Sequence, residues 1–400
     1  NTLVEISDYL YKKNPEGANE IINKLEAKYK QHIDELYSTE EYKQKTLDFV
    51  KSVFDYIRSY TKDIFTLFEE KVILAQGEII STNMVTNYLC EQGVKAILIP
   101  ALEYMRTDKN GEPDLTYIRE KLEAQLEANP GYEIYITQGF ICRNAYGEID
   151  NLQRGGSDYT ASLIGAAINA SEIQIWTDID GMHDNDPRVV DKTSPVRQLH
   201  FEEAAELAYF GAKILHPTCI QPAKYANIPV RLLNTMEPSA PGTLISNDTE
   251  KGKIKAVAAK DNITAIKIKS SRMLLAHGFL RKVFEIFESY QTAIDMVCTS
   301  EVGVSMSIDN TKHLNEIVND LKKYGTVTVD HDMCIVCVVG DLEWENVGFE
   351  AKALDAMREI PVRMISFGGS NYNISFLIRE ADKKRALQSL SDVLFNGNKK

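Results

Sequence analysis

The chain has 400 residues, of which 44% are hydrophobic and 26% charged, and it carries a formal net charge of −13. This composition is ordinary for a globular protein, and the length predicts two or three domains. The acidic balance, without a stripe rich in lysine and arginine, argues against nucleic acid as a partner. No apolar run is long enough to predict a membrane span, so a membrane is not expected as a partner either.

The six cysteines lie mostly in apolar segments, a distribution that fits a reducing cytoplasm. Cys334 and Cys337 form a CxxC pair inside a run that indicates a buried strand, with no second pair nearby, so no metal site is predicted. The chain starts at Asn1 and enters a helix-like segment almost at once, whereas an α/β enzyme usually begins with a strand. We therefore expect an N-terminal piece to be missing from this sequence.

The first 70 residues are predicted to be rich in helix, because residues 16–36 and 40–68 carry apolar side chains at spacings of three and four. From about residue 71 the pattern changes to alternation. Strands are predicted at 96–100, 132–137, 172–176 and 230–233, and helices at 115–126, from 157, at 201–209 and from Pro217. Such alternation predicts a mostly parallel sheet covered by helices on both faces, with a ligand at the carboxyl ends of its strands.

Beyond a loop at 237–242 and a linker at 246–252, the sequence repeats itself with a shift of 70 residues. Gly278 and Phe279 recur as Gly348 and Phe349, and Ser300 recurs as Ser370. Each copy is predicted to run strand, helix, strand, strand, helix, which is the order of a small split-βαβ domain. We therefore predict three domains, at residues 1–248, 255–330 and 331–400.

Residues 152–160 bring an arginine, two adjacent glycines, a hydroxyl and a carboxylate together directly before a helical run of small residues. Glycines let backbone N–H groups approach an anion closely, and a helix starting at Ser157 directs its positive end to the same point. Arg154 adds a planar fork for a carboxylate or phosphate. Asp158 places a negative group among these, which favours reactant positioning or metal contact over simple anion binding. A tight strand-to-helix turn with a serine cap is the alternative.

Four further segments accompany this turn, at residues 75–82, 136–140, 176–189 and 210–217. In this order, the five motifs closely resemble those of aspartate kinases, a branch of the amino-acid kinase superfamily. The C-terminal repeat resembles the tandem ACT regulatory domains of the same enzymes, and lysine-sensitive members are the most similar. The resemblance implies a three-layer α/β/α kinase domain with a mostly parallel sheet, followed by two α+β domains of the ACT type.

The resemblance also implies a reaction, in which MgATP as co-substrate phosphorylates the side-chain carboxylate of L-aspartate to 4-phospho-L-aspartate, without a tightly bound cofactor. Phosphoryl transfer depends on positioning and on positive charge around a dispersed anion, and the arginines, Lys213 and the glycine turn could supply that charge. The matching positions imply catalytic roles for Asp158 and Arg154, substrate contacts for Glu78, Phe140, Arg154 and Ser157, and nucleotide contacts for Thr177, Asp178, His183, Arg188 and Lys213.

Three features depart from the family pattern. Relatives begin with a strand and a loop of the Lys-Phe-Gly-Gly type, whose lysine contacts the transferred phosphate, and no such segment occurs here. Gln153 stands where many relatives have glycine, and His183 stands where several have tyrosine. We expect the first difference to reflect an incomplete sequence.

The regulatory half carries an effector site in this interpretation, because residues 273–280 lead into a helix N-terminus that suits a carboxylate. L-Lysine is the expected effector, at an interface between the ACT-like domains of a homo-oligomer, with Asp295 or Glu301 meeting its side-chain ammonium. The second repeat has Ile365 and Asn371 at the corresponding positions, so it is expected to serve assembly. The predicted effector contacts are Met273, Gly278, Phe279, Leu280, Ala293, Ile294, Asp295 and Glu301.

Two other functions remain open at this point. One is a kinase for another amino acid or for a nucleotide on the same fold. The other is a non-catalytic amino-acid-binding regulator with a degenerate kinase domain, which the missing lysine loop would favour. A plain dimerisation module is the alternative for the C-terminal repeat.

Overall fold

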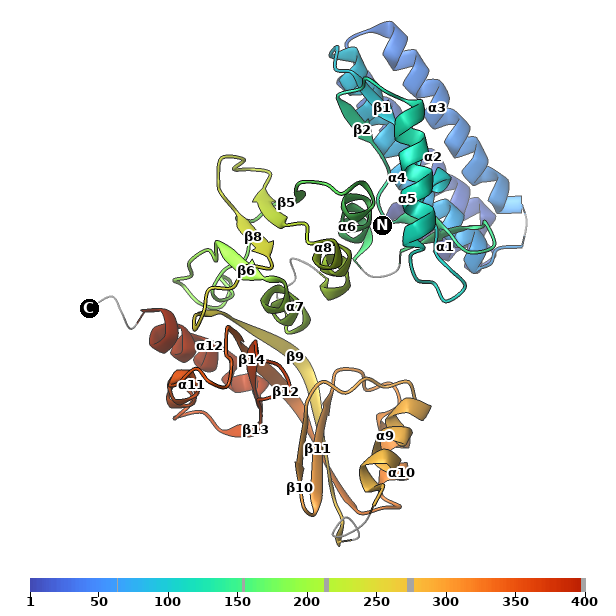
Figure 1. Cartoon of the computed structure of the whole chain (residues 1–400). Helices are drawn as coiled ribbons and strands as arrows, with labels where there is room; N and C mark the ends of the chain where they lie inside the picture. Colours follow the sequence, from blue (N-terminus) through green and yellow to red (C-terminus); the bar gives the residue numbers. More distant parts are fainter. Residues whose placement is uncertain (63, 153–154, 212–215, 272–276, 397–400) are drawn as a thin grey trace. The chain divides into compact units, whose positions relative to one another are not determined.

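The computed structural model describes residues 1–62, 64–152, 155–211, 216–271 and 277–396 (Figure 1). The chain divides into two compact units, each with its own hydrophobic core. Unit 1 contains residues 1–173 and 221–228, and unit 2 contains residues 174–220 and 229–400. None of the described helices is both long and apolar enough to cross a bilayer.

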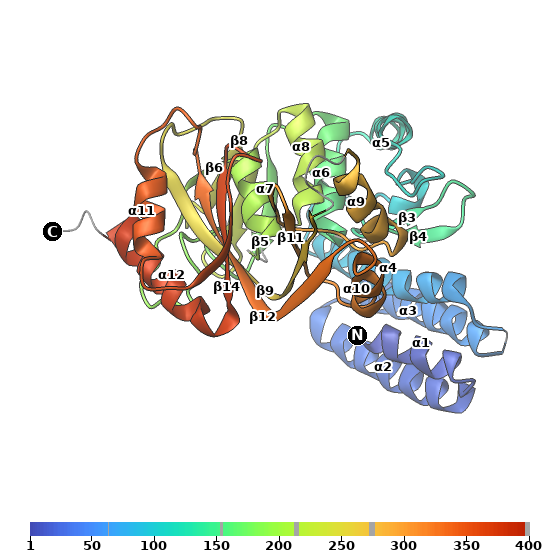
Figure 2. The same cartoon turned by 90° about the horizontal axis from the view of Figure 1, so that it is seen from below.

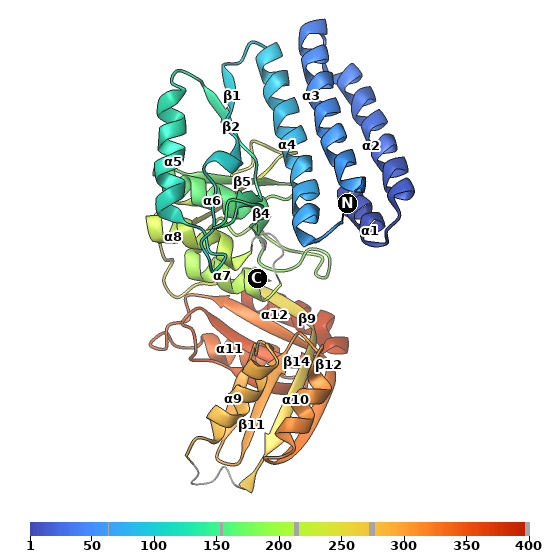
Figure 3. The same ribbon diagram turned by 90° about the vertical axis from the view of Figure 1, so that its right-hand side faces the viewer.

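Unit 1 begins with four helices that pack side by side (Figure 3). They are α1 (Thr2–Tyr11), α2 (Pro15–Leu36), α3 (Glu40–Ser59) and α4 (Leu67–Glu91). Pro15 and the side chain of Asn14 begin α2, and a capping box of Thr66 and Glu69 begins α4. The apolar positions that predicted the first helices lie in a shared core, which includes Ile6, Ile22, Ile33, Phe54 and Ile57, and Ile73 and Ile80 of α4 complete it.

The helix α4 differs from the sequence prediction in two ways. The helix predicted at 40–68 ends at Ser59. The residues from 71 onward, where strands and helices were expected to alternate, continue α4 as far as Glu91. Buried residues of α4 lie on several of its faces, as Ile73, Ala75 and Gln76 show. A helix that is covered on more than one side lacks a single apolar stripe, so its helical period is hidden in the sequence.

The remainder of unit 1 has short strands and three helices. The strands β1 (Ala96–Leu98) and β2 (Ile134–Ile136) pair in parallel, and β3 (Ile141–Arg143) and β4 (Ile149–Asn151) form an antiparallel hairpin. The helix α5 (Leu115–Ala128) packs on α6 (Gly156–Ile168), which also contacts α8 (Gln221–Ala226). Tyr104 and Met105 are fully buried in the core between these elements.

In unit 2 a four-stranded sheet has the order β5-β7-β8-β6. Its strands are β5 (Ile173–Thr177), β6 (Gln198–His200), β7 (Val230–Asn234) and β8 (Thr243–Ser246), and α7 (Phe201–Tyr209) follows β6. β6 and β8 are parallel, whereas β7 and β8 are antiparallel. The mixed α/β class predicted for residues 1–248 is therefore confirmed. Within the described residues, however, the strands form separate small sheets of mixed direction and not one mostly parallel sheet.

The C-terminal repeat predicted from the sequence is confirmed by a six-stranded antiparallel sheet with the symmetric order β10-β11-β9-β12-β14-β13. The first repeat contributes β9 (Ile254–Lys269), α9 (Phe279–Ser289), β10 (Val297–Ser300), β11 (Gly303–Ile308) and α10 (Leu314–Leu321). The second contributes β12 (Thr326–Gly340), α11 (Phe349–Ala356), β13 (Val362–Ser366), β14 (Asn373–Arg379) and α12 (Lys383–Ser391). The helices α11 and α12 lie together beside these strands (Figure 2).

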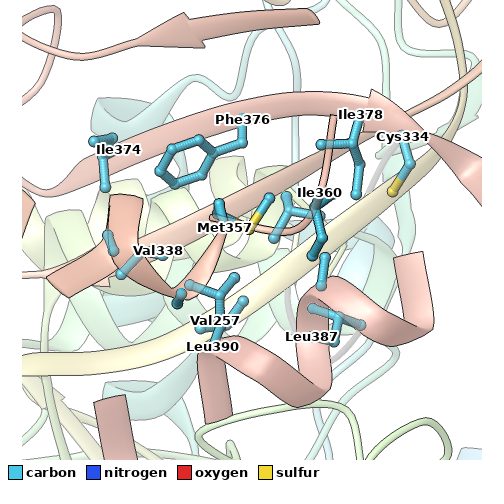
Figure 4. Packing of buried hydrophobic residues seen from close by; sticks show 14 of the residues in the cluster. Val257, Cys334, Val338, Met357, Ile360, Ile374, Phe376, Ile378, Leu387 and Leu390 are labelled. Carbon is cyan, nitrogen blue, oxygen red and sulfur yellow. The ribbon is translucent and has the colours of Figure 1, made fainter. Parts of the chain in front are cut away.

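The strands β9 and β12 pair along their length, and each enters both hydrophobic cores. Ile266 and Ile268 of β9 lie in the core of the first repeat, whereas Val257 of β9 lies in the core of the second (Figure 4). The register between the two strands is interrupted near the middle, where Asn262 and Asp332 have positive φ angles of 60° and 55°. The two repeats therefore share strands, and β9 begins in the second repeat's core before it reaches the first.

Candidate functional site

The glycine turn before α6 has the left-handed backbone that its sequence predicts. Gly155 has a φ of 87° and Gly156 a φ of 44°, and α6 begins at Gly156. Ser157 therefore lies in the first turn of the helix and does not cap it, contrary to the alternative of a serine cap. A Cβ atom on Gly139 would lie 2.8 Å from the Cβ atom of Ser157, so a larger residue could not stand there. Arg154 and Gln153 lie outside the described residues.

Phe140 is fixed against this turn in an unusual conformation. Its φ of 71° is rare for a residue with a side chain, and such strained residues concentrate at functional sites. Its backbone N–H donates to Thr160 Oγ1 at 2.9 Å, and its carbonyl accepts from the N–H of Leu152 at 2.7 Å. The predicted substrate residue Phe140 therefore lies beside the predicted anion cradle, 3.7 Å from the position of a Cβ atom on Gly156.

Two carboxylates of unit 1 have no compensating charge among the described residues. Glu78 on α4 and Asp158 on α6 are half-buried, and burial raises the pKa of both. Within the described ranges, neither side chain has a hydrogen-bond partner or an ion pair. A half-buried carboxylate without a partner attracts a cation, such as the ammonium group of an amino acid or a metal ion.

Gln138 is a supporting residue to which the sequence analysis gave no role. Its side chain is almost fully buried. Its Oε1 accepts from the N–H of Ala101 at 2.7 Å, and its Nε2 donates to Thr82 Oγ1 on α4 at 2.9 Å. Gln138 thus joins the helix of Glu78 to the segment of Phe140. In the sequence, the only signal was a glutamine directly after the predicted strand 132–137 and two positions before Phe140.

The predicted nucleotide residues all lie in unit 2. Thr177 ends β5, and its Oγ1 accepts from the N–H of Ile179 at 3.1 Å, so it orders the turn that carries the exposed Asp178. His183 Nδ1 lies 2.9 Å from Thr193 Oγ1. Lys213 lies outside the described residues.

Arg188 is held by Asp186, a residue for which no role was predicted from the sequence. Asp186 Oδ1 accepts from Arg188 Nε at 2.9 Å, and Oδ2 accepts from Nη2 at 2.8 Å. The hydrogen bonds from Arg188 lower the pKa of the Asp186 carboxyl despite its partial burial. The exposed guanidinium is thus pre-oriented at the surface of its loop.

Asp295, a predicted effector residue, already has partners in the chain. Its Oδ1 accepts from Lys260 Nζ at 2.7 Å and from the hydroxyl of Tyr209 at 2.8 Å, and its side chain is only 2% exposed. Lys260 also pairs with Asp309 at 2.9 Å and lies over the Tyr209 ring. Burial disfavours the charge of Lys260, but these hydrogen bonds outweigh it and raise its pKa.

The predicted effector contacts divide between two ends of the first repeat. Gly278, Phe279 and Leu280 begin α9, whereas Ala293, Ile294 and Asp295 follow its end. An eleven-residue helix is about 16 Å long, so one lysine molecule could not contact both groups within one chain. The exposed Glu301 is in the β10–β11 turn, at the opposite end of β10 from Asp295. Met273 lies outside the described residues.

The CxxC pair is part of a buried strand, as predicted. Cys334 and Cys337 are fully buried in β12, and burial raises the pKa of both thiols. Among the described residues, no group of three or more histidine, cysteine, aspartate or glutamate side chains could hold a metal ion.

Comparison with known proteins defines the class. Residues 17–234 match the Amino acid kinase family, and residues 336–394 match the ACT domain family. The chain thus belongs to the amino acid kinase family and carries an ACT domain. It is 34% identical to the lysine-sensitive aspartokinase 3 of Escherichia coli, over 81% of this chain and 75% of that protein. It is 36% identical to the chloroplastic aspartokinase 1 of Arabidopsis thaliana, over 82% of this chain and 61% of that protein.

These identities and coverages show that the chain belongs to the aspartokinase family. Solved structures agree. The E. coli aspartokinase III in complex with aspartate and ADP has a TM-score of 0.79 at 30% identity, covering 98% of this chain and 91% of that one. The same enzyme with lysine and aspartate has a TM-score of 0.78 at 31% identity, covering 98% and 90%. The chain spans about three fifths of the length of the Arabidopsis relative.

Proposed function

We propose that this protein transfers the γ-phosphoryl group of MgATP to the side-chain carboxylate of L-aspartate. The observation that carries the proposal is the glycine cradle at the start of α6, with Phe140 beside it and two half-buried carboxylates of the same unit, Glu78 and Asp158, that have no partner among the described residues. A substrate with an anionic end and an ammonium group complements this combination. The similarity to an aspartokinase that binds aspartate and ADP supports the same substrates here.

In this proposal the residues of unit 1 bind the amino acid. The N–H groups at the start of α6 and the Arg154 guanidinium hold carboxylates of aspartate. Glu78 accepts the substrate ammonium, which removes the unfavourable burial of an isolated carboxylate. Phe140 and Ser157 line the substrate position, and Asp158 organises the reacting groups.

The residues of unit 2 bind the nucleotide in this proposal. Thr177, Asp178 and His183 contact the nucleoside part, and Arg188 and Lys213 meet the phosphates. Charge on the phosphates increases where the bond to the γ-phosphoryl group breaks, so fixed cations at this point lower the barrier. Asp186 supports this because it holds the Arg188 guanidinium in place.

L-Lysine is the proposed effector, and it would bind the first repeat. The E. coli relative whose structure contains lysine supports this choice. Because α9 separates Gly278 from Asp295 in one chain, the two groups of contacts would come from two copies in a homo-oligomer. Inhibition follows only if lysine binds the less active arrangement better, by about 1–3 kcal/mol.

Trapping of the acyl phosphate with hydroxylamine tests the reaction, with aspartate, glutamate, N-acetylglutamate and UMP compared and ADP release measured in parallel. We expect aspartyl hydroxamate from aspartate and MgATP only. Turnover with another acceptor but not with aspartate would identify a different kinase. Lysine binding without any turnover would favour a non-catalytic regulator.

The substrate assignment is tested by Arg154→Ala. Loss of a charged bidentate contact in a partly dry site should reduce transition-state stabilisation, measured from kcat/KM for aspartate, by about 2–4 kcal/mol. ATP affinity should change little. Arg119→Ala, at an exposed arginine of α5, is the matched control and should leave kcat/KM unchanged. Near-normal kcat/KM in Arg154→Ala would contradict the assignment.

A further inference from the structure

The loop that carries His183 and Arg188 is closed at its base by hydrogen bonds within unit 2. The N–H of Met182 donates to Thr243 Oγ1 at 2.8 Å. The N–H of Asp184 donates to the carbonyl of Ser194 at 2.9 Å, and the Asp184 carboxylate accepts from the N–H of Ser194 at the same distance. Residues 184–194, called the arch below, therefore form a loop whose two ends are held together by hydrogen bonds.

The far side of this arch is inserted into the core of the second repeat. Val190 is only 1% exposed and belongs to the same buried cluster as Val338, Phe376 and Leu390. Figure 4 labels these last three residues. Val189 packs against that cluster as well. Burial of a valine side chain contributes about 1.5–3 kcal/mol, so the packing of Val190 attaches the arch firmly to this core.

Two hydrogen bonds connect residues 184 and 185 to elements of the same core, namely α12 and the first part of β9. Asn185 is 3% exposed, and its Nδ2 donates to the carbonyl of Leu387 in α12 at 3.0 Å. The carbonyl of Asp184 accepts from the N–H of Val257 in β9 at 2.8 Å. Asn185 Oδ1 also accepts from the N–H of Asp186, the residue that orients Arg188. A continuous series of contacts thus runs from α12 to the Arg188 guanidinium.

We propose that Asn185 and Val190 are positioning residues for nucleotide binding, and that the second repeat anchors the loop that carries His183 and Arg188. The proposal rests on the proposed nucleotide role of His183 and Arg188. It gives the second repeat a task in catalysis beyond assembly, because the loop cannot hold Arg188 in place unless its arch is anchored. Neither Asn185 nor Val190 touches the nucleotide itself in this proposal.

Two matched valine substitutions test it. Val190→Ala and Val336→Ala remove the same methyl groups from the same core, but Val336 lies on β12 and not on the arch. The full-length protein is compared by melting temperature, by calorimetry with MgATP and with aspartate, and by hydrogen exchange of residues 183–190. Asn185→Ala is measured in the same way.

We expect both valine variants to lower the melting temperature to a similar extent. Val190→Ala and Asn185→Ala should weaken MgATP binding at least fivefold, leave aspartate binding within twofold and accelerate exchange at residues 183–190. Val336→Ala should change neither. Equal MgATP affinities in Val190→Ala and Val336→Ala would overturn the proposal. A wild-type protein that does not bind MgATP would contradict the proposed function instead, and the exchange comparison would still decide whether the repeat anchors the loop.

Discussion

The two C-terminal repeats follow the same chain path but contact residues 174–246 in different ways. The first repeat uses polar groups, because Asp295 accepts from Tyr209 at the end of α7 and from its own Lys260. The second repeat uses mainly apolar packing, with Val190 in its core, and adds a stack of the His200 and Tyr372 rings, 5.3 Å apart and 5° from parallel. One attachment depends on charge, and the other on burial.

This difference indicates which repeat responds to a ligand. An ion pair weakens when a competing ion arrives or when a partner changes its protonation state, whereas buried apolar contacts do not respond to either. Since Lys260 occupies the carboxylate expected to meet a lysine ammonium, an effector that uses Asp295 must compete with Lys260 and Tyr209. We therefore expect the first repeat to be the responsive one and the second to be the fixed support.

The largest effects should come from Phe376→Ala and Phe287→Ala, which each remove a fully buried ring, from the second and the first core respectively. Each should lower the free energy of unfolding by about 3–5 kcal/mol. Only Phe376→Ala should also weaken MgATP binding, because its core contains Val190. Urea unfolding and calorimetry below both melting temperatures are the measurements. A loss of MgATP affinity in Phe287→Ala as large as in Phe376→Ala would remove the distinction between the repeats.

Asp295→Ala should have the next largest effect. It removes an acceptor of Tyr209 and leaves Lys260 with the more exposed Asp309, so we expect a loss of about 2–3 kcal/mol in stability and of lysine binding. Asp309→Ala, at the other carboxylate of Lys260, is the matched control and should cost under about 1 kcal/mol. Calorimetry with lysine and with threonine decides the ligand. Undiminished lysine binding in Asp295→Ala would disprove the assignment.

Tyr209→Phe should have a smaller effect, about 1 kcal/mol at neutral pH, because one hydrogen bond is lost. Burial and the hydrogen bond to Asp295 raise the pKa of Tyr209 to about 12, from an unfolded value near 10. A raised pKa stabilises the fold fully below pH 10, and this contribution is lost as the pH rises toward 12. The stability difference between wild type and Tyr209→Phe should therefore shrink over that interval in urea titrations. A constant difference would show that folding does not raise the pKa of the Tyr209 hydroxyl.

The smallest effect on stability should be that of Glu301→Gln. Glu301 is exposed in the β10–β11 turn, so unfolding should change by no more than about 0.5 kcal/mol. Lysine affinity should nevertheless fall about tenfold if a second copy supplies this carboxylate. An unchanged affinity would leave Asp295 as the only acidic effector contact, and a loss of stability would mean that Glu301 has a structural role.

Local patterns in the sequence predicted much of the fold. The bounds of α7 and the order of elements in both repeats follow from short-range periodicity and from the shift of 70 residues, and the structure agrees with both. The helix α4 was missed because packing on several faces removed its period. The sheet of the kinase part was predicted as continuous because strand pairing is a long-range property that no local window contains.

For the candidate site, residue types were predictable but partners were not. The glycine turn was visible because only glycine adopts its backbone easily, as Gly155 shows. The supporting role of Asp186 and the anchoring of Val190 depend on which distant segments meet. Asp295 was predicted as an effector contact, and its partners in the chain were not predicted because they are 35 and 86 residues away along the sequence. The proposed roles of Arg154, Lys213 and the other site residues remain predictions.

The long strand β9 restricts how the two repeats can move against each other. At about 50 Å it is a rod that belongs to both cores, and sliding it by one residue would turn its side chains to the wrong face in both at once. Bending remains possible where the register with β12 breaks, at Asn262 and Asp332. Relative motion of the two repeats is therefore confined to bending at these residues, and each end of the strand pair stays fixed in its own core.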